Sequence, residues 1–323
     1  MWGNRLGWMM AGALVVVMIT AIAIAYVVSG KRTEPTAFGL DQANLAVLEL
    51  PRDPRQLLPT QGQDADAGAV YWRAVDDYQK NITEYERLAA AFDAKRALAL
   101  DGVKAVLEAA DYRKASLFDG RIEAAVGYGS RPGVNALHRV GAVVARLGTD
   151  YAQKRQFDEA RKYLLASYVL GFHLYDQRMS RLQLTTGLGL MAQSATVLKQ
   201  IENADGKTDA GKRYDEFVSS YQKYYTEHVE PMERVLTSVD PKVLATHVGD
   251  VFAIVEKSQE RVWRVEGVLK LGMYKYYTNT AGDRRAAVRT VRSLLQDPDP
   301  AVAAAALAAR ELTLAQYRTI GAR

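Results

Sequence analysis

Histidines are the first residues whose chemistry could mark a site, because imidazole can bind metal ions and can act as a base near neutral pH. The chain has 323 residues and four histidines, His138, His173, His228 and His247. None of them lies in an HExxH motif or in another pair with the spacing of metal ligands. We interpret His138 and His173 as partly buried packing residues, because they lie on the apolar faces of neighbouring predicted helices.

Carboxylates are densest in the segment EHVEPMER, which contains Glu227, His228, Glu230 and Glu233. Pro231 interrupts this segment, and the ligand spacing of di-metal carboxylate helices is absent. The chain has no cysteine, which excludes disulfides, thiolate zinc sites and cysteine nucleophiles. No serine lies in a GxSxG motif. The sequence therefore predicts no catalytic residue, no metal site and no cofactor, and we do not expect an enzyme.

Tyrosine is unusually frequent, with 18 tyrosines against 7 phenylalanines. The motif KYYT occurs twice, at Lys223–Thr226 and at Lys275–Thr278. Such tyrosines could stack on sugars or contact an acidic partner. We interpret them instead as lining half-buried helix faces with their hydroxyls in water.

Positive charge is concentrated at the carboxyl end. Residues 261–323 hold 11 of the 42 Lys and Arg residues but only 5 of the 37 Asp and Glu residues. This imbalance predicts a basic surface for an acidic protein partner or for anionic lipid headgroups, and no nucleic acid is expected. The residues predicted to form this surface are Arg284, Arg285, Arg289, Arg292, Lys270 and Lys275.

The elements that would position these residues are helices, because apolar residues recur at spacings of three and four. No segment shows the alternation of a strand, so the predicted fold class is all-α. A helical domain at 66–203 and a helical extension at 209–323 are expected on either side of the segment NADGKTDAG. A first helix is predicted by the apolar period from Val70 to Phe92. The other predicted helices are 94–112, 134–154, 157–177, 180–202, 209–228 and a long stretch to about Thr278 in which Gly249 offers a break.

The first 30 residues have the composition of a transmembrane helix. No residue from Leu6 to Gly30 is charged, and as a helix this run would rise about 37 Å, enough to cross a hydrocarbon core of about 30 Å. A cleaved signal peptide is the alternative, although its apolar region is usually shorter. We expect an anchor at 1–30, followed by an unpacked proline-rich tether at 31–65.

The positive charges that flank the apolar run are nearly balanced and hardly decide its orientation in the membrane. They are Arg5 on one side and Lys31 and Arg32 on the other. By themselves these charges favour a cytoplasmic body slightly. A single helix after a short tail nevertheless has the form of an export signal. We therefore expect a single-pass membrane protein with an extracytoplasmic (in a bacterium, periplasmic) body, with the cytoplasmic orientation as the alternative.

One segment, at about 141–174, has the residue spacing of a tetratricopeptide unit. The residues that carry it are Val144, Leu147, Gly148, Tyr151, Phe157, Ala160, Leu164 and Ser167. Gly148 and Ala160 are small enough to let two helices approach closely. The segment resembles a single tetratricopeptide repeat, although Phe172 stands where proline usually ends the second helix. No second copy occurs at a period of 34.

A second hairpin, at about 283–320, resembles a single HEAT-type repeat. The residues at its turn are Leu294, Leu295, Asp297, Pro298, Asp299, Pro300 and Val302. We expect Asp299 to cap the second helix, whereas Ala303 replaces the arginine common in that family. The alanine-rich stripe from Val302 to Leu312 is expected to pack on the helix that carries Val262 and Leu269, because repeat units need neighbours.

More broadly, the chain resembles a group of membrane-anchored or exported bacterial helical proteins of unknown function. This resemblance implies architecture and location only. We expect a membrane-tethered helical-repeat protein that acts as a non-catalytic scaffold or adaptor for a protein partner at the cell envelope. The alternatives are an enzyme with a dispersed active site that acts on envelope glycans, and a binder of anionic lipid or polymer through the basic carboxyl end.

Overall fold

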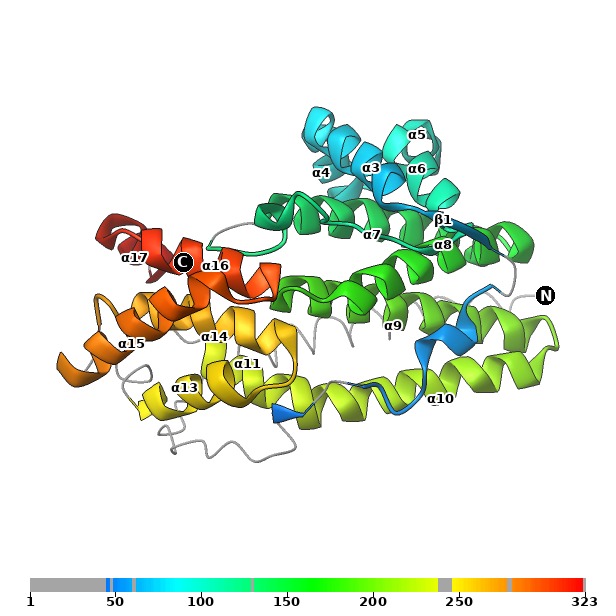
Figure 1. Cartoon of the computed structure of the whole chain (residues 1–323). Helices are drawn as coiled ribbons and strands as arrows, with labels where there is room; N and C mark the ends of the chain where they lie inside the picture. The colour runs from blue at the N-terminus through cyan, green and yellow to red at the C-terminus, as the bar shows by residue number, and fades with distance from the viewer. Residues whose placement is uncertain are drawn as a thin grey trace. The chain divides into compact units, whose positions relative to one another are not determined.

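The computed structural model describes residues 45–46, 49–59, 62–128, 131–237, 246–277 and 281–321 (Figure 1). The chain divides into the units Met1–Phe38 and Gly39–Arg323. The predicted anchor at 1–30 falls in the first unit, outside the described residues. No helix among the described residues is both long and apolar enough to cross a membrane.

The described part of the second unit is almost entirely helical, which confirms the predicted all-α class. Its centre is a run of long helices, each packed on the next along the chain (Figure 1). They are α7 (Pro132–Gln153), α8 (Phe157–Gln177), α9 (Arg181–Ala204) and α10 (Thr208–Tyr224). The predicted ranges agree with these bounds within a few residues, because the period of the apolar residues continues to each turn.

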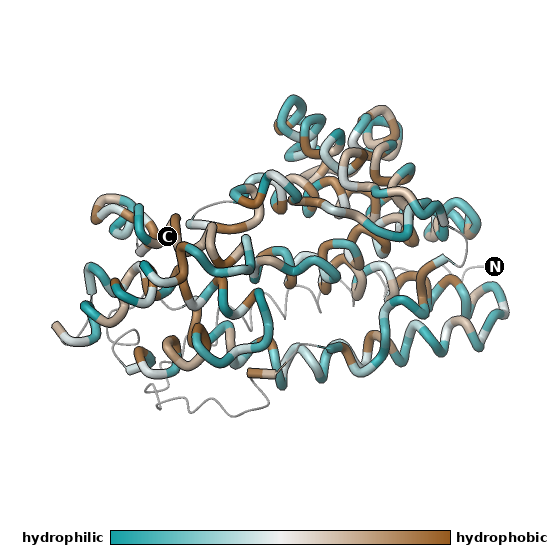
Figure 2. Tube along the Cα trace, in the orientation of Figure 1, coloured by the Kyte–Doolittle hydropathy of each residue, from teal (hydrophilic) through white to brown (hydrophobic). Residues whose placement is uncertain are grey.

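Burial differs sharply between these helices. α8 contacts α6, α7 and α9 and is buried along nearly its whole length. α10 buries only Gly211, Phe217 and Tyr224, and it is mostly hydrophilic in Figure 2. α8 is therefore the core helix of this unit, whereas α10 covers one side of it.

Close helix crossings depend on glycine at two places. A Cβ added to Gly148 would lie 2.5 Å from Cγ of Leu164 on α8, so α7 and α8 touch where the sequence predicted. A Cβ on Gly171 would lie 2.7 Å from the carbonyl oxygen of Gly187, and one on Gly187 would lie 2.6 Å from that of Gly171. α8 and α9 are thus in backbone contact, a crossing that the sequence analysis did not identify.

We expect Gly148→Leu and Ala160→Leu each to lower the free energy of unfolding by about 1–3 kcal/mol, because extra carbons would overpack the crossing. Gly189→Leu is a matched control, since nothing lies within 4 Å of a Cβ at Gly189 and this exposed helical position gains helix propensity. Urea unfolding of the three variants measures the difference. A Gly148→Leu variant as stable as Gly189→Leu would contradict the tight crossing.

Before the central helices lie four shorter ones. They are α3 (Gly68–Lys80), α4 (Ile82–Ala90), α5 (Ala94–Ala99) and α6 (Asp101–Ala109). Two short strands, β1 (Gln63–Asp66) and β2 (Tyr112–Lys114), pair in parallel beside them. The expectation of no strand is therefore wrong here, because three or four residues are too few to show alternation.

The prediction of an unpacked tether at 31–65 is also wrong for the residues in it that the structure describes. A 3₁₀-helix at Pro54–Leu57 lies against the central helices, and the hydroxyl of Tyr168 donates to the Pro54 carbonyl at 3.1 Å. The Leu50 N–H donates to the hydroxyl of Tyr175 at 3.3 Å. Proline limited helix formation in this segment, but it did not prevent packing.

A π-helical turn at Tyr225–Val229 joins α10 to α11 (Glu230–Thr237). The helix continues through Pro231, so the predicted interruption at this proline is wrong. Proline lacks the N–H for the usual bond to the carbonyl four residues earlier, and a π-turn shifts that register. This wider turn explains why Pro231 is tolerated.

The remaining helices are α13 (Val248–Lys257), α14 (Arg261–Met273), α15 (Ala281–Ser293), α16 (Pro300–Glu311) and α17 (Leu314–Gly321). The helical stretch is interrupted at His247, next to the predicted Gly249, and again at Ser258–Glu260, where the Glu260 N–H donates to Oγ of Ser258 at 3.2 Å.

The expected docking of the carboxyl-terminal hairpin is confirmed, since α16 packs on α14. Oδ1 of Asp299 accepts the Ala301 N–H at 2.9 Å, as the predicted cap requires. A Cβ on Gly272 of α14 would lie 2.8 Å from Cβ of Ala309. The buried stripe of the second helix consists of Val302, Ala305, Ala306, Ala309 and Leu312.

The predicted division between 66–203 and 209–323 does not separate two structural units, because both ranges lie in Gly39–Arg323. α9 packs on both α10 and α14. The ion pair between Arg178 and Glu260 and the one between Arg181 and Glu233 also cross the expected boundary. The segment NADGKTDAG is therefore a helix-to-helix turn.

Candidate functional site

The four predicted surface arginines, Arg284, Arg285, Arg289 and Arg292, are all exposed on α15. Arg285, Arg289 and Arg292 share a side away from the buried Ala287 and Val291, and Arg284 is exposed in the first turn. In the described part of residues 261–323, ion pairs with carboxylates are formed by Arg261, Arg264 and Arg310 and not by these four arginines. α15 therefore presents a row of four guanidinium groups to solvent, which we call the α15 arginine face.

Lys275 lies near this region but has a structural contact. Its Nζ donates to the carbonyl of Arg310 at 2.6 Å and to that of Leu312 at 3.2 Å. These carbonyls end α16, so Lys275 caps the carboxyl end of that helix. Burial lowers the pKa of Lys275. Lys275 is half-buried and contributes only partly to a basic surface.

The prediction that Lys270 faces solvent is wrong, because Lys270 is only 2 % exposed. α14 is enclosed by α9, α11, α13 and α16, which leaves it no open face. The buried residues of α14 are Val262, Trp263, Val265 and the run from Gly267 to Met273. Lys270 therefore cannot contact a partner at the surface of the folded chain.

A buried network of charged side chains surrounds the start of α9. Oε1 of Glu266 accepts from Nη1 of Arg131 at 2.7 Å and from the Arg181 N–H at 2.9 Å. Nη1 of Arg181 also pairs with Oε1 of Glu233 at 2.8 Å, and the hydroxyl of Tyr225 donates to Oε2 of Glu233 at 2.6 Å. The network joins α7, α9, α11 and α14, so it fixes their relative positions.

Protonation in this network is strongly perturbed. Burial alone would raise the pKa of Glu266, but Arg131 and the Arg181 N–H outweigh it and lower that pKa. Burial lowers the pKa of Lys270 to about 7, with Glu266 opposing the shift and Arg181 adding to it. The cations Arg131, Arg181 and Lys270 outnumber the carboxylates Glu233 and Glu266 in this network.

The histidines and the acidic segment do not assemble a metal site. His173 is buried and its Nδ1 lies 3.0 Å from the hydroxyl of Tyr71, while burial lowers the pKa of His173 to about 4. His138 is exposed on α7, although partial burial still lowers its pKa. No group of three or more His, Cys, Asp or Glu residues in the described chain is placed to hold a metal ion.

The tyrosines are more deeply buried than expected. Tyr71, Tyr85, Tyr168 and Tyr274 are among the largest fully buried or nearly fully buried side chains. The hydroxyl of Tyr85, for example, donates to Oδ2 of Asp77 at 2.8 Å. Burial raises the pKa of each of these four tyrosines. Our interpretation that tyrosine hydroxyls lie in water is wrong for those that bond inside the protein.

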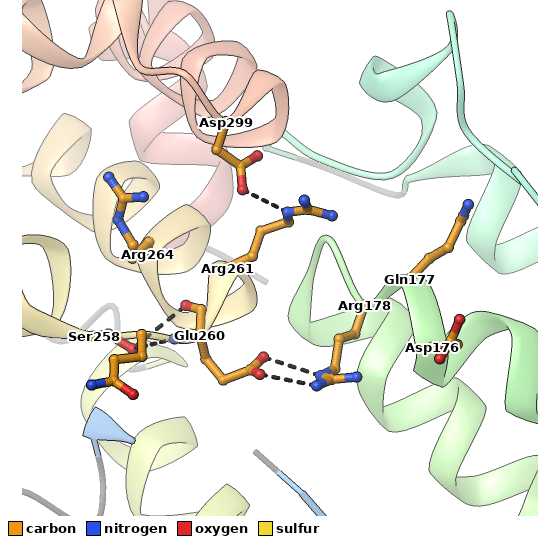
Figure 3. A pocket seen from close by; sticks show the side chains of 9 residues that line it. Asp176, Gln177, Arg178, Ser258, Glu260, Arg261, Arg264 and Asp299 are labelled. Carbon is orange, nitrogen blue, oxygen red and sulfur yellow. Dashed lines mark hydrogen bonds and ion pairs between the residues drawn. The ribbon is translucent and has the colours of Figure 1, made fainter. Parts of the chain in front are cut away.

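A polar cavity of about 460 Å³ lies where three helix ends meet. The carboxyl end of α8, the start of α14 and the cap of α16 surround it (Figure 3). We call it the arginine-lined cavity. Its lining residues are Asp176, Gln177, Arg178, Ser258, Gln259, Glu260, Arg261, Arg264 and Asp299.

Ion pairs shape the wall of this cavity. Arg178 holds Glu260 through two bonds of 3.0 Å, in the bidentate geometry that guanidinium and carboxylate favour. Nε of Arg261 donates to Oδ2 of Asp299 at 2.6 Å. Nη2 of Arg264 pairs with Asp297 at 2.5 Å. The cavity can form directed hydrogen bonds with a polar ligand, and no described side chain in it is arranged as a nucleophile with its base.

The sequence analysis missed the cavity because its three parts are far apart in the chain. The Asp299–Pro300 helix start was the only part with a local signal. Arg178 and Glu260 are 82 positions apart, and nothing in the sequence pairs them. A second pocket of about 350 Å³, lined in part by Phe172, Tyr112 and Arg113, was missed for the same reason.

Comparison with known proteins does not assign a function to this site. No family model, no curated protein and no solved structure is detectably similar to the chain.

Proposed function

We propose that this chain is a non-catalytic helical scaffold that binds an acidic protein partner at the cell envelope, tethered there by residues 1–30. The α15 arginine face carries the proposal. Four exposed guanidinium groups on one short helix, without carboxylate partners among the described residues, create a local positive potential. Such a potential steers an acidic partner toward the surface and favours its binding.

The packing of α15 supports this role. α15 lies on α14 and α16 through Ala287 and Val291, and α16 is held to α14 by its alanine stripe. A docked helix holds its arginines in a fixed arrangement. Binding to a preorganised surface loses less conformational entropy than binding to a mobile tail.

The two hairpins favour a scaffold over a catalyst. The pair α7–α8 contains the tetratricopeptide-like spacing, and the pair α15–α16 contains the HEAT-like turn. Repeats of both kinds are stacking units that offer extended surfaces. The uncharged run from Leu6 to Gly30 has the length of a membrane anchor, which is the reason for proposing an envelope location and an extracytoplasmic body.

Photo-crosslinking in intact cells tests the proposal. Replacing Arg289 with p-benzoylphenylalanine should give protein adducts that mass spectrometry identifies. The same photoprobe at Lys162, an exposed position on α8, serves as the matched control and should not give these adducts. Charge reversal through Arg284→Glu, Arg285→Glu and Arg292→Glu should abolish the adducts at position 289.

Other outcomes would contradict the proposal. Adducts with lipid alone would favour the alternative function, binding of anionic headgroups by the same arginines. Protein adducts that survive charge reversal would show that the α15 arginine face does not select the partner.

A further inference from the structure

We propose that the arginine-lined cavity is a second contact site for the acidic partner, in which a carboxylate of that partner is bound. The inference rests on the proposed function, but it concerns a separate surface formed by α8, α14 and α16. It is carried by the hydrogen-bonding groups that the cavity leaves unused.

Three carboxylates line the cavity: Asp176 pairs with Arg55 at 2.9 Å through Oδ1, and Glu260 and Asp299 use both of their oxygens. Both oxygens of Glu260 accept from Arg178. Oδ1 of Asp299 accepts the Ala301 N–H, and its Oδ2 accepts from Arg261. These acceptors have little capacity left for the donors of a ligand. Next to Glu260 and Asp299, a ligand rich in donors, such as an ammonium group, is therefore disfavoured.

Arg261, in contrast, keeps donors available. A guanidinium has five N–H donors, and the bond recorded for Arg261 in the described chain uses Nε alone. In Figure 3 the terminal nitrogens of Arg261 extend from Asp299 across the cavity, toward the end of α8 that carries Gln177 and Arg178. The Arg261 side chain is 42 % exposed, so an incoming group can reach it. Two parallel N–H donors match the two oxygens of a carboxylate.

The lining also limits what part of a ligand can enter. Every residue that lines the cavity is polar or charged. An apolar body would gain little from entering such a space, because hydrophobic stabilisation scales with the apolar area removed from water. The positive amino-terminal ends of α14 and α16 also begin at this cavity and favour an anion. The fitting group is thus a carboxylate at the end of a side chain whose backbone stays outside.

Fluorescence anisotropy with the full-length chain tests the site, using fluorescein-labelled hexaglutamate at low ionic strength as the probe. Arg261→Gln should weaken binding about tenfold, as expected for the loss of a charge-assisted hydrogen bond. Arg73→Gln is the matched control, since Arg73 is exposed on α3 and the change in net charge is the same. It should alter the Kd less than about twofold.

A second variant guards against an indirect effect of losing the contact between Arg261 and Asp299. Gln177→Glu keeps the oxygen that accepts the Leu117 N–H at 3.0 Å, and it adds a negative charge to the cavity wall. It should also weaken hexaglutamate binding, with an unchanged melting temperature for the chain.

The outcomes separate the two proposals. Kd values for Arg261→Gln and Gln177→Glu that equal the value for Arg73→Gln would overturn the cavity site. The cavity site would also be overturned if only Arg289→Gln weakened hexaglutamate binding. That result would still agree with partner binding at the α15 arginine face. A wild-type chain that does not bind hexaglutamate would also overturn the cavity site, whereas the crosslinking result at position 289 stands independently.

Discussion

Glu266→Gln is expected to lower the free energy of unfolding by about 3–5 kcal/mol, the usual cost of removing one partner from a buried ion pair. The side chains of Glu266 and Arg131 are only 11 % and 9 % exposed, and they lie 2.7 Å apart. Glutamine keeps an acceptor for the Arg181 N–H but removes the negative charge. Arg131 would then remain in the interior without this carboxylate, and Lys270 would lose the negative charge of Glu266.

The same substitution at the surface provides the control. Glu108 pairs with Arg73 at 2.6 Å, with 49 % and 58 % of the two side chains exposed. Glu108→Gln should cost about 0–1 kcal/mol, because water screens an exposed pair. Urea unfolding of both variants gives the comparison. Equal losses would show that the buried network contributes no more than a surface pair.

A double variant tests whether the loss comes from the pair itself. Arg131→Gln alone should lower the free energy of unfolding. The double variant should lose less free energy than the sum of the two single variants, because the arginine that Glu266→Gln leaves unpaired is removed as well. Additive losses would assign the effect of Glu266→Gln to packing.

Helices whose bounds are set by local sequence patterns, such as apolar spacing or a capping residue, were predictable from the sequence. The bounds of α7, α8 and α9 follow from apolar spacing, and the start of α16 follows from Asp299 and Pro300. Short elements were not predictable in this way. Asn81 ends α3 and divides a continuous apolar period into two helices, and β1 and β2 are too short to show a period of two.

The environment of Lys270 shows why the candidate site was only partly predictable. Glu266 and Lys270 are four residues apart, the spacing of a surface ion pair on an exposed helix. The structure buries both, because Arg131 and Arg181 reach Glu266 from helices more than 80 positions away. Which face of α14 is open depends on those distant helices. Exposure of the α15 arginines was easier to predict, since alanine and valine on the other side already marked the buried face.

Lys270→Met is expected to change how stability depends on pH. Burial lowers the pKa of Lys270 to about 7 in the folded chain, whereas an unfolded lysine titrates near 10.4. Between these values the unfolded chain carries a proton that the folded chain lacks. Stability therefore rises with pH across this window, by up to about 1.4 kcal/mol per pH unit. Below the window both states bind the proton, so this contribution is at its minimum and constant.

Urea unfolding from pH 6 to pH 9 measures this effect as the difference between the wild type and Lys270→Met. The wild type should gain stability relative to the variant above about pH 7, and the difference should be flat below it. Lys104→Met, at an exposed lysine on α6 that pairs with Asp101, should follow the wild-type curve because Lys270 is intact. Parallel curves for the wild type and Lys270→Met would show that Lys270 keeps its proton in the folded chain, which would require more compensating negative charge than Glu266 and Glu233 supply.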